Sequence, residues 1–248
     1  MAGHSQFKNI MHRKGAQDKK RARIFARLSR EIMVAAKSGG SDPSSNPRLR
    51  TALVAARAAN MPKDNIERAI KKATTEADAS NFEEMRYEGY GPSGVAVIVE
   101  ALTDNRNRTA SELRTAFSKN GGALGETGSV SFMFDHIGTL KFPKTISFDT
   151  LFEEAVSLGA DNVEEDEAFL VVTCAFEKFA TLRDHLTEKF NDPLEASISW
   201  TPKTLIAVDE DAARTLLKMI DIIEENDDVQ NVFANFDISD DILEKLSS

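Results

Sequence analysis

Apolar residues recur at helical spacing through the first 75 residues of the chain. Within 18–37 they fall every three to four positions on one stripe, which predicts a helix with one packed side. Asn46 before Pro47 is typical of an N-cap followed by a first-turn proline, so a second helix is expected over 47–59, and a third from Pro62. This part of the chain is therefore predicted to form a small helical bundle. The stripe of the first helix consists of Ile24, Phe25, Leu28, Ile32 and Ala35.

From about residue 80 onward the pattern changes to β-branched runs that alternate with helical stretches. The runs GVAVIVEALT, SVSFMF, TLIAV and VQNVFANFDI predict strands, whereas RTASELRTAFSKNGG and DEDAARTLLKMIDIIEEN predict helices, the second capped by Asp209. Residues 136–202 repeat this alternation. Their predicted strands are IGTLKF, NVEED, AFLVVTC and EASISW, and their predicted helices are FDTLFEEAVSLG and FEKFATLRDHLTEKF.

These elements predict an α+β multidomain protein. We expect an N-terminal helical bundle followed by two ferredoxin-like α/β sandwiches, the last of them inserted into the middle one. The basic arm and helical domain would cover 1–75, the discontinuous α+β domain 80–135 plus 203–240, and the inserted α+β domain 136–202. Two consecutive α+β domains fit the same pattern almost as well.

Charge divides the chain more sharply than its composition suggests, since the formal net charge of the whole is only −9. Residues 1–75 hold 17 Lys and Arg against 5 Asp and Glu, a net of +12, and the remainder has a net of −21. Such polarity favours a first domain that binds a polyanion. The alternative interpretation is that the basic helices form a solvated face or dock on the acidic part of the same chain.

The remaining composition narrows the class of protein. Cys174 is the only cysteine and lies among apolar neighbours, so neither a disulfide nor a thiol metal site is expected. The sequence has no 18-residue apolar stretch and no apolar core of a secretory signal behind its basic start. We therefore expect a cytoplasmic protein with no membrane partner, and give an organelle transit peptide little weight.

The basic N-terminal segment is the first candidate for nucleic-acid binding. Its Gly and Ser residues let the chain follow a phosphate track, with Phe7 available for stacking on a base. No helix in this segment presents the Asn, Gln and Arg combination of a base-reading recognition helix. The candidate phosphate contacts are Lys8, Arg13, Lys14, Lys19, Lys20, Arg23, Arg27 and Arg30, the last five on the polar side of the first helix.

The stretch TDNRNRTASELR is the second candidate, because it follows a predicted strand and starts a predicted helix. Arg106 and Arg108 would lie where the backbone amides of a helix start already favour anions. Alternatively Thr109 or Asn107 is an ordinary N-cap and the arginines are exposed or paired with nearby acids. Both interpretations stay open. The glycine-rich NGGALGETGSV lacks the Lys-Ser/Thr ending of a P-loop.

Catalysis finds little support in the residue types. The four histidines are scattered, without HExxH or Cys/His ligand spacing, and the acidic runs lack a calcium-loop pattern. We expect a non-enzymatic protein with no catalytic residue, no metal, no cofactor and no small-molecule substrate.

Four long blocks resemble the signature blocks of the YebC/PmpR family. They are AGHSQFKNIMHRKGAQDKKRARIFARLSREI, AANMPKDNIERAIKKA, YEGYGPSGVAVIVEALTDNRNRTASELRTAFSKNGGALGETGSVSFMF and DDVQNVFANFDI. The resemblance implies three domains, with the middle one interrupted by the third. Phe7 and Phe132 stand where the family pattern leads us to expect Trp. A Phe at these positions keeps the aromatic face but lacks the indole N–H donor of Trp.

The resemblance also implies a function in gene expression. The family is usually labelled as probable DNA-binding transcriptional regulators, which is the first expectation for this chain. Mitochondrial relatives are translational activators, and some bacterial relatives act on the ribosome during synthesis of proline-rich nascent chains. The alternative expectation is therefore a translation factor that binds ribosomal RNA.

Overall fold

The computed structural model describes residues 17–75 and 82–247, with side chains over 21–74 and 82–246. The described residues divide into two compact units. The first unit holds those of 1–27, 80–135 and 201–248, and the second holds those of 28–79 and 136–200. No helix of the described residues is long and apolar enough to cross a membrane.

Three helices open the described chain: α2 (Gln17–Gly39), α3 (Pro47–Ala58) and α4 (Lys63–Thr75). The predicted cap of α3 is confirmed, because the Asn46 side chain accepts a hydrogen bond from the Leu49 amide at 3.0 Å. The same side chain donates to the carbonyl oxygens of Ala35 and Gly40, at 2.8 and 2.7 Å. Asn46 thus joins the end of α2 to the start of α3.

The second unit also contains a four-stranded sheet with order β5-β6-β4-β7. The elements run β4 (Phe134–Pro143), α6 (Phe148–Ser157), β5 (Asn162–Glu165), β6 (Phe169–Ala175), α7 (Phe176–Phe190) and β7 (Glu195–Pro202). The strands β5 and β4 both pair antiparallel with β6, with Val163 and Leu140 opposite Val172. Apolar residues of both helices and the sheet form one core. All four strands and both helices predicted for this segment are confirmed.

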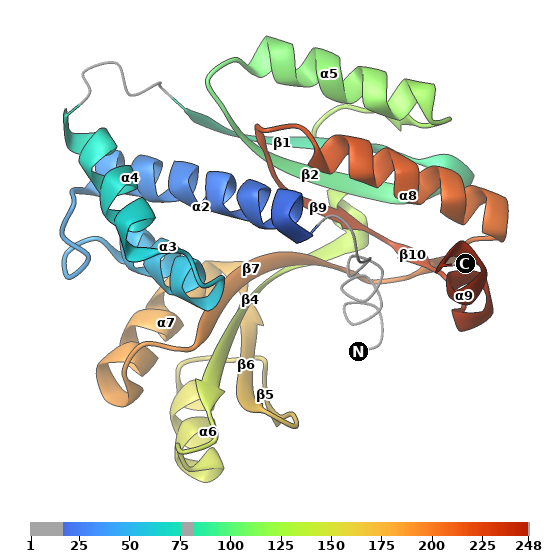
Figure 1. Ribbon diagram of the computed structural model, residues 1–248. Coiled ribbons are helices and arrows are strands. Elements are labelled where there is room, and N and C mark those ends of the chain that lie inside the picture. The colour runs from blue at the N-terminus through green and yellow to red at the C-terminus, as the bar shows by residue number, and fades with distance from the viewer. Residues whose placement is uncertain (1–16, 76–81, 248) are drawn as a thin grey trace. The chain divides into compact units, whose positions relative to one another are not determined.

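The first unit is built on a sheet with order β3-β1-β2-β9. Its strands are β1 (Glu83–Tyr90), β2 (Ala96–Thr103), β3 (Ala123–Leu124) and β9 (Val229–Ala234). The helices α5 (Arg106–Lys119) and α8 (Glu210–Glu224) lie side by side on this sheet (Figure 1). The core includes Val97, Val99, Phe117, Leu216 and Ile220.

Short elements complete the first unit. The 3-10 helix η1 (Pro92–Gly94) joins β1 to β2, and η2 (Ser131–Met133) precedes β4. The two-residue strands β8 (Ile206–Ala207) and β10 (Phe236–Asp237) pair in parallel, and α9 (Asp240–Ser247) packs Ile242, Leu243 and Leu246 against the core.

Several predicted elements of this unit are wrong. Strand β1 was not predicted, because EEMRYEGY shows little apolar periodicity. The run SVSFMF forms η2 and the first residue of β4 instead of a separate strand, and TLIAV contributes only the two residues of β8. Ile24, expected on the packed stripe of the first helix, is 37% exposed.

Candidate nucleic-acid interface

The structure places only part of the predicted basic segment. Lys8, Arg13 and Lys14 lie outside the described residues, as does Phe7. Lys19 and Lys20 lie in the first turn of α2, outside the described side chains. The geometry of the segment therefore rests on Arg23, Arg27 and Arg30, which follow along α2.

Two of the predicted phosphate contacts bind the carboxyl end of α8. Arg23 Nη2 lies 2.8 Å from Glu225 Oε1, and Arg27 Nη2 donates to the carbonyl oxygen of Glu224 at 2.8 Å. Glu224 is the last residue of α8, so Arg27 caps a helix end whose carbonyl groups carry partial negative charge. Arg27, expected to face solvent opposite the packed stripe, is instead half-buried against α8, whereas Arg23 keeps part of its side chain in solvent.

Burial distinguishes these arginines. Desolvation lowers the pKa of Arg27 and neighbouring Arg23 lowers it further, whereas the charges of Glu224 and Asp227 partly offset this fall. The Arg23 side chain is 39% exposed, so a solvent-facing ligand can reach it. Arg30 is half-buried and belongs to the second unit. The alternative that basic helices dock on the chain's own acids thus describes Arg23 and Arg27 well.

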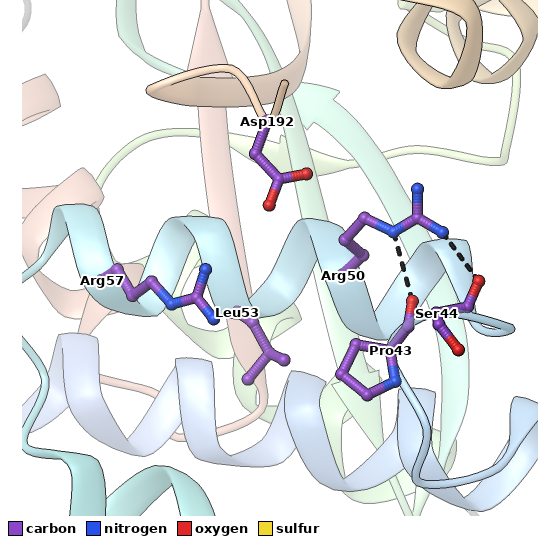
Figure 2. A pocket seen from close by; sticks show the side chains of 6 residues that line it. All are labelled: Pro43, Ser44, Arg50, Leu53, Arg57 and Asp192. Atoms are coloured by element: carbon purple, nitrogen blue, oxygen red, sulfur yellow. Dashed lines mark hydrogen bonds between the residues drawn. The ribbon is translucent and has the colours of Figure 1, made fainter. Parts of the chain in front are cut away.

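A pair of arginines on α3 was missed by the sequence analysis. Arg50 and Arg57 are seven residues apart, about two helical turns, and therefore share a side of α3. They line an open pocket of about 240 Å³, with Asp192 approaching from the segment after α7 (Figure 2). Arg50 Nε donates to Pro43 O at 3.2 Å and Nη2 to Ser44 O at 3.0 Å. Pro43, Ser44 and Leu53 complete the lining of the pocket.

The pocket on α3 has mixed charge. Arg50 is held by two carbonyl oxygens, and the Asp192 carboxylate would repel an incoming anion. The seven-residue spacing was visible in the sequence, but nothing in the sequence placed Asp192 beside it. We assign no ligand to this pocket.

The turn at the start of α5 has a different cap from those considered. Asn105 is the N-cap, and its side chain accepts from the Arg108 amide at 3.1 Å, so the assignment to Thr109 or Asn107 is wrong. Arg106 is exposed at this helix start. Arg108 Nη2 lies 2.9 Å from Asp104 Oδ1 and 2.7 Å from Asp228 Oδ2. Arg106 and Arg108 thus lie together in sequence but have different surroundings.

Asp228 is the centre of a buried polar cluster that sequence reasoning missed. Its Oδ2 accepts from Thr109 Oγ1 at 2.7 Å and Thr103 Oγ1 at 3.1 Å, in addition to Arg108. Burial alone would raise the pKa of Asp228, but hydrogen bonds from Arg108, Thr109 and Thr103 outweigh it and hold the pKa below its ordinary value. The cluster ties β2 and α5 to the turn before β9.

The glycine-rich loop before β4 is held by a buried carboxylate. Glu88 on β1 is buried, and its Oε2 accepts from the amides of Val130 and Ser131 at 2.9 and 2.8 Å. Burial raises the pKa of Glu88, but hydrogen bonds from the amides of Val130, Gly128 and Ser131, with the nearby Arg86 charge, lower it further than burial raises it. Glu88 therefore stays ionised and fixes the loop.

The 3-10 helix η2, which directly follows this loop, presents Phe132 to solvent. Phe132 is 66% exposed, the highest value among the exposed large apolar side chains of the described residues. Its carbonyl oxygen accepts from Lys203 Nζ at 3.2 Å, and the Tyr90 hydroxyl donates to Ser129 O at 3.2 Å. An aromatic ring on so constrained a loop is suited to stack on a planar partner.

Comparison with known proteins identifies the family. Residues 5–76 match the family model described as the TACO1/YebC protein N-terminal domain, and residues 82–236 match the model for the TACO1/YebC second and third domain. The chain belongs to the TACO1/YebC family. The resemblance read from the sequence blocks is thereby confirmed.

A crystal structure supports the same relationship. It is that of a conserved hypothetical protein from Aquifex aeolicus, 42% identical, covering 92% of this chain and 98% of that chain, with a TM-score of 0.72. The family model for 82–236 includes the Asp228 cluster, the Glu88 loop and Phe132, whereas the basic segment lies in the TACO1/YebC N-terminal domain.

The described part of the chain was also compared with the requirements of a metal site and of a reactive thiol. Among the described residues, no group of three or more His, Cys, Asp and Glu side chains is placed to hold a metal ion. Cys174 is buried in the core of the second unit, and its burial raises the pKa of the thiol. His136 is stacked between Phe176 and Trp200, with ring centroids 4.1 Å from each.

Proposed function

We propose that this protein is a non-enzymatic, nucleic-acid-binding regulator of gene expression. The single observation that carries the proposal is the net charge of +12 over residues 1–75 in a chain whose net charge is −9. A segment this basic is attracted to phosphate through release of condensed counterions, whatever the base sequence. The transcription-regulator label of the model that matches 82–236 supports DNA as the target.

The proposed contacts are the basic residues of the arm and of α2, with Arg106 as a separate contact on the first unit. Arg108 is held between two carboxylates, so we propose for it a positioning role at the start of α5. The arm and helix contacts are Lys8, Arg13, Lys14, Lys19, Lys20, Arg23, Arg27 and Arg30. We place the protein in the cytoplasm, as the family resemblance implies, acting without a cofactor.

A second candidate function is favoured by Phe132. Single-stranded RNA offers unstacked bases that aromatic side chains can bind, whereas the bases of a DNA duplex are stacked. The 66% exposed ring on its braced loop fits an unpaired base of ribosomal RNA better than a duplex. On this alternative the protein is a ribosome-binding translation factor that assists synthesis of proline-rich nascent chains.

We also propose a domain architecture for the chain. Residues 136–202 run strand, helix, strand, strand, helix, strand, and the third strand in chain order lies between the first and second in the sheet. This order supports a ferredoxin-like sandwich, inserted between 80–135 and 203–240. In the interrupted region the β1–β2 hairpin, rather than two strand-helix-strand units, forms the centre of the sheet.

Competition at physiological salt tests the proposal. Labelled promoter DNA is bound to the full-length protein and titrated with random DNA and, separately, with purified ribosomes. A transcriptional regulator should prefer its site by about a thousandfold or more and keep it against ribosomes. Loss of the DNA to ribosomes, without preference for any promoter, would favour the translation factor instead. Absence of binding to all three would refute nucleic-acid binding.

The salt dependence tests the basic arm itself. Replacing Lys8, Arg13 and Lys14 together by Ala should lower the slope of log affinity against log salt, by about 0.7 to 0.9 for each phosphate that the variant no longer neutralises. The matched control replaces Lys144, Lys178 and Lys189, which lie in the second unit outside the proposed contacts. An equal slope in the two triple variants would contradict the assignment of the arm.

A further inference from the structure

The segment at the carboxyl end of α8 is unusually acidic for the place that it occupies. Four of the five residues from Glu224, the last residue of α8, to Asp228 are acidic, and they lie where the helix dipole adds negative charge. We call Glu224–Asp228 the acidic segment. A helix end is ordinarily stabilised by cations, so this segment needs positive partners.

Asp228 is paired with Arg108, and two further partners come from the proposed nucleic-acid-binding side of α2. Arg23 Nη2 lies 2.8 Å from Glu225 Oε1, and Arg27 Nη2 donates to Glu224 O at 2.8 Å. Both pairs lie within the first unit, although about 200 residues separate their members. The acidic segment therefore already occupies guanidinium donors that the proposed function assigns to phosphate.

The geometry of the arginine donors suits either anion, the Glu225 carboxylate or a nucleic-acid phosphate. A guanidinium presents N–H groups in a planar fork, which carboxylate and phosphate oxygens accept in the same way. Glu225 neutralises the charge of Arg23, and a phosphate that shared this guanidinium would lie against the Glu225 carboxylate, so the two anions repel each other there. Binding of the two anionic partners is accordingly competitive at this side chain, and by thermodynamic linkage each weakens the other.

We propose that the acidic segment is an intramolecular competitor of nucleic acid, which lowers the affinity of α2 for polyanions. This inference rests on the proposed function, because it takes nucleic acid as the ligand of α2. The competitor is weak: the Arg23 and Glu225 side chains are 39% and 60% exposed, and exposed ion pairs of this kind shift an equilibrium by only about two- to fivefold.

A weak competitor has a specific use. A random polyanion that makes few contacts binds weakly, whereas a ligand that also engages the rest of the basic segment binds tightly. The acidic segment lowers the affinity of every ligand that must displace Glu225 by the same factor. Ligands present near their Kd then lose occupancy, whereas ligands present far above their Kd stay bound. Arg27 donates to a backbone carbonyl of α8 rather than to an acidic side chain, so the competition is tested at Arg23.

Substitution of Glu225 by Gln tests the inference in the full-length protein. Affinities for two probes, a labelled oligouridylate and a mixed-sequence DNA duplex, are measured at low ionic strength by fluorescence anisotropy. Glu225→Gln should bind about two- to fivefold more tightly than the control Glu126→Gln. Glu126 is an exposed acid of the same unit, so both variants change the net charge equally. In an Arg23→Gln background, Glu225→Gln should give no gain over this control.

The outcomes are separable. If Glu225→Gln binds no better than Glu126→Gln while the wild type binds the probes, the proposal that the acidic segment competes is overturned and the proposed function stands. A gain that persists in the Arg23→Gln background also overturns it, because the effect then does not pass through this pair. If the wild type binds neither probe, the proposed function fails, and the competitor with it. Thermal unfolding of each variant verifies that the fold is retained.

Discussion

Arg108 Nη2 lies 2.7 Å from Asp228 Oδ2, although 120 positions separate the two residues in the sequence. The pair joins the first turn of α5 to the turn that leads into β9, and Thr103 and Thr109 donate to the same oxygen. The sequence left Arg108 either as a phosphate contact or as an arginine paired with nearby acids. Its ion pairs with Asp104 and Asp228 match the second interpretation, and they help to position the start of α5, although its side chain is exposed.

Removing the charge of Asp228 should destabilise the first unit. Asp228→Asn weakens several hydrogen bonds to an ionised, buried acceptor, so we expect a loss of about 2 kcal/mol in the free energy of unfolding. Urea denaturation followed by circular dichroism measures it. The control is Asp104→Asn, which removes only the exposed partner of Arg108 and should change stability by less than about 1 kcal/mol. Equal losses in the two variants would show that the buried cluster contributes nothing beyond a surface ion pair.

Stability should fall in acid because of Glu88. Its folded-state pKa lies below that of an unfolded Glu, which is about 4.3, so folding favours the ionised form. The resulting stability is fully present above the unfolded pKa and is lost as the pH falls through the folded-state pKa. Asp228 acts in the same direction, since its pKa is also lowered. Urea midpoints should therefore decline below about pH 4.

The variant Glu88→Gln separates this contribution from other carboxylates. It should be less stable at neutral pH by about 1 to 3 kcal/mol, because the amides of Val130 and Ser131 lose a charged acceptor. Its stability should also depend less on pH in the acid range. An acid dependence as steep as that of the wild type would contradict the assignment to Glu88.

Phe132 should matter for binding and not for folding. Because the ring is 66% exposed, Phe132→Ala is expected to change stability by no more than about 0.5 kcal/mol. If it stacks on a base, affinity for single-stranded RNA should fall by about 5- to 100-fold, whereas affinity for duplex DNA should not change. Phe152→Ala, which removes another exposed ring, 43% exposed, serves as the control. An unchanged RNA affinity would remove the observation that favours the translation factor.

Gly138 should tolerate no side chain. A Cβ atom at this position of β4 would lie 2.1 Å from Phe179 Cδ2, far inside contact distance. Gly138→Ala is therefore expected to cost about 1 to 3 kcal/mol through overpacking. The double variant Gly138→Ala with Phe179→Leu should recover part of that loss, because the smaller side chain leaves room. Failure of the second substitution to recover any stability would place the cause in the backbone rather than in the clash.

The sequence predicted the second unit well because each element there follows its local pattern. Strand β6, for example, alternates towards a core that includes Leu170, Val172 and Cys174. In the first unit, the local pattern failed to predict strand β1 because Glu88 is a buried polar residue of that strand. The buried carboxylate made β1 look polar, and it binds the amides of Val130 and Ser131, which were expected to belong to a strand. No local signal reveals such a long-range acceptor.

In the candidate site too, the local sequence pattern of helix α2 does not reveal contacts with distant residues. Helical spacing placed Arg23 and Arg27 on the polar side of α2, and the net charge pointed to a polyanion. Their partners, Glu225 and Glu224, lie about 200 residues away in the sequence, so spacing within the helix carries no information about them. The possibility of docking on the chain's own acids was visible, but the acids themselves were not identifiable.

The order of the strands in the first sheet has a consequence for synthesis of the protein. Strand β2 lies between β1 and β9, but about 125 residues of chain separate the end of β2 from the start of β9. At about 5 to 20 residues per second, a ribosome makes β9 roughly 6 to 25 s after β2. During that interval one edge of an almost fully buried apolar strand lacks its hydrogen-bonding partner. Nascent chains, rather than finished ones, are therefore the form of this protein most exposed to aggregation.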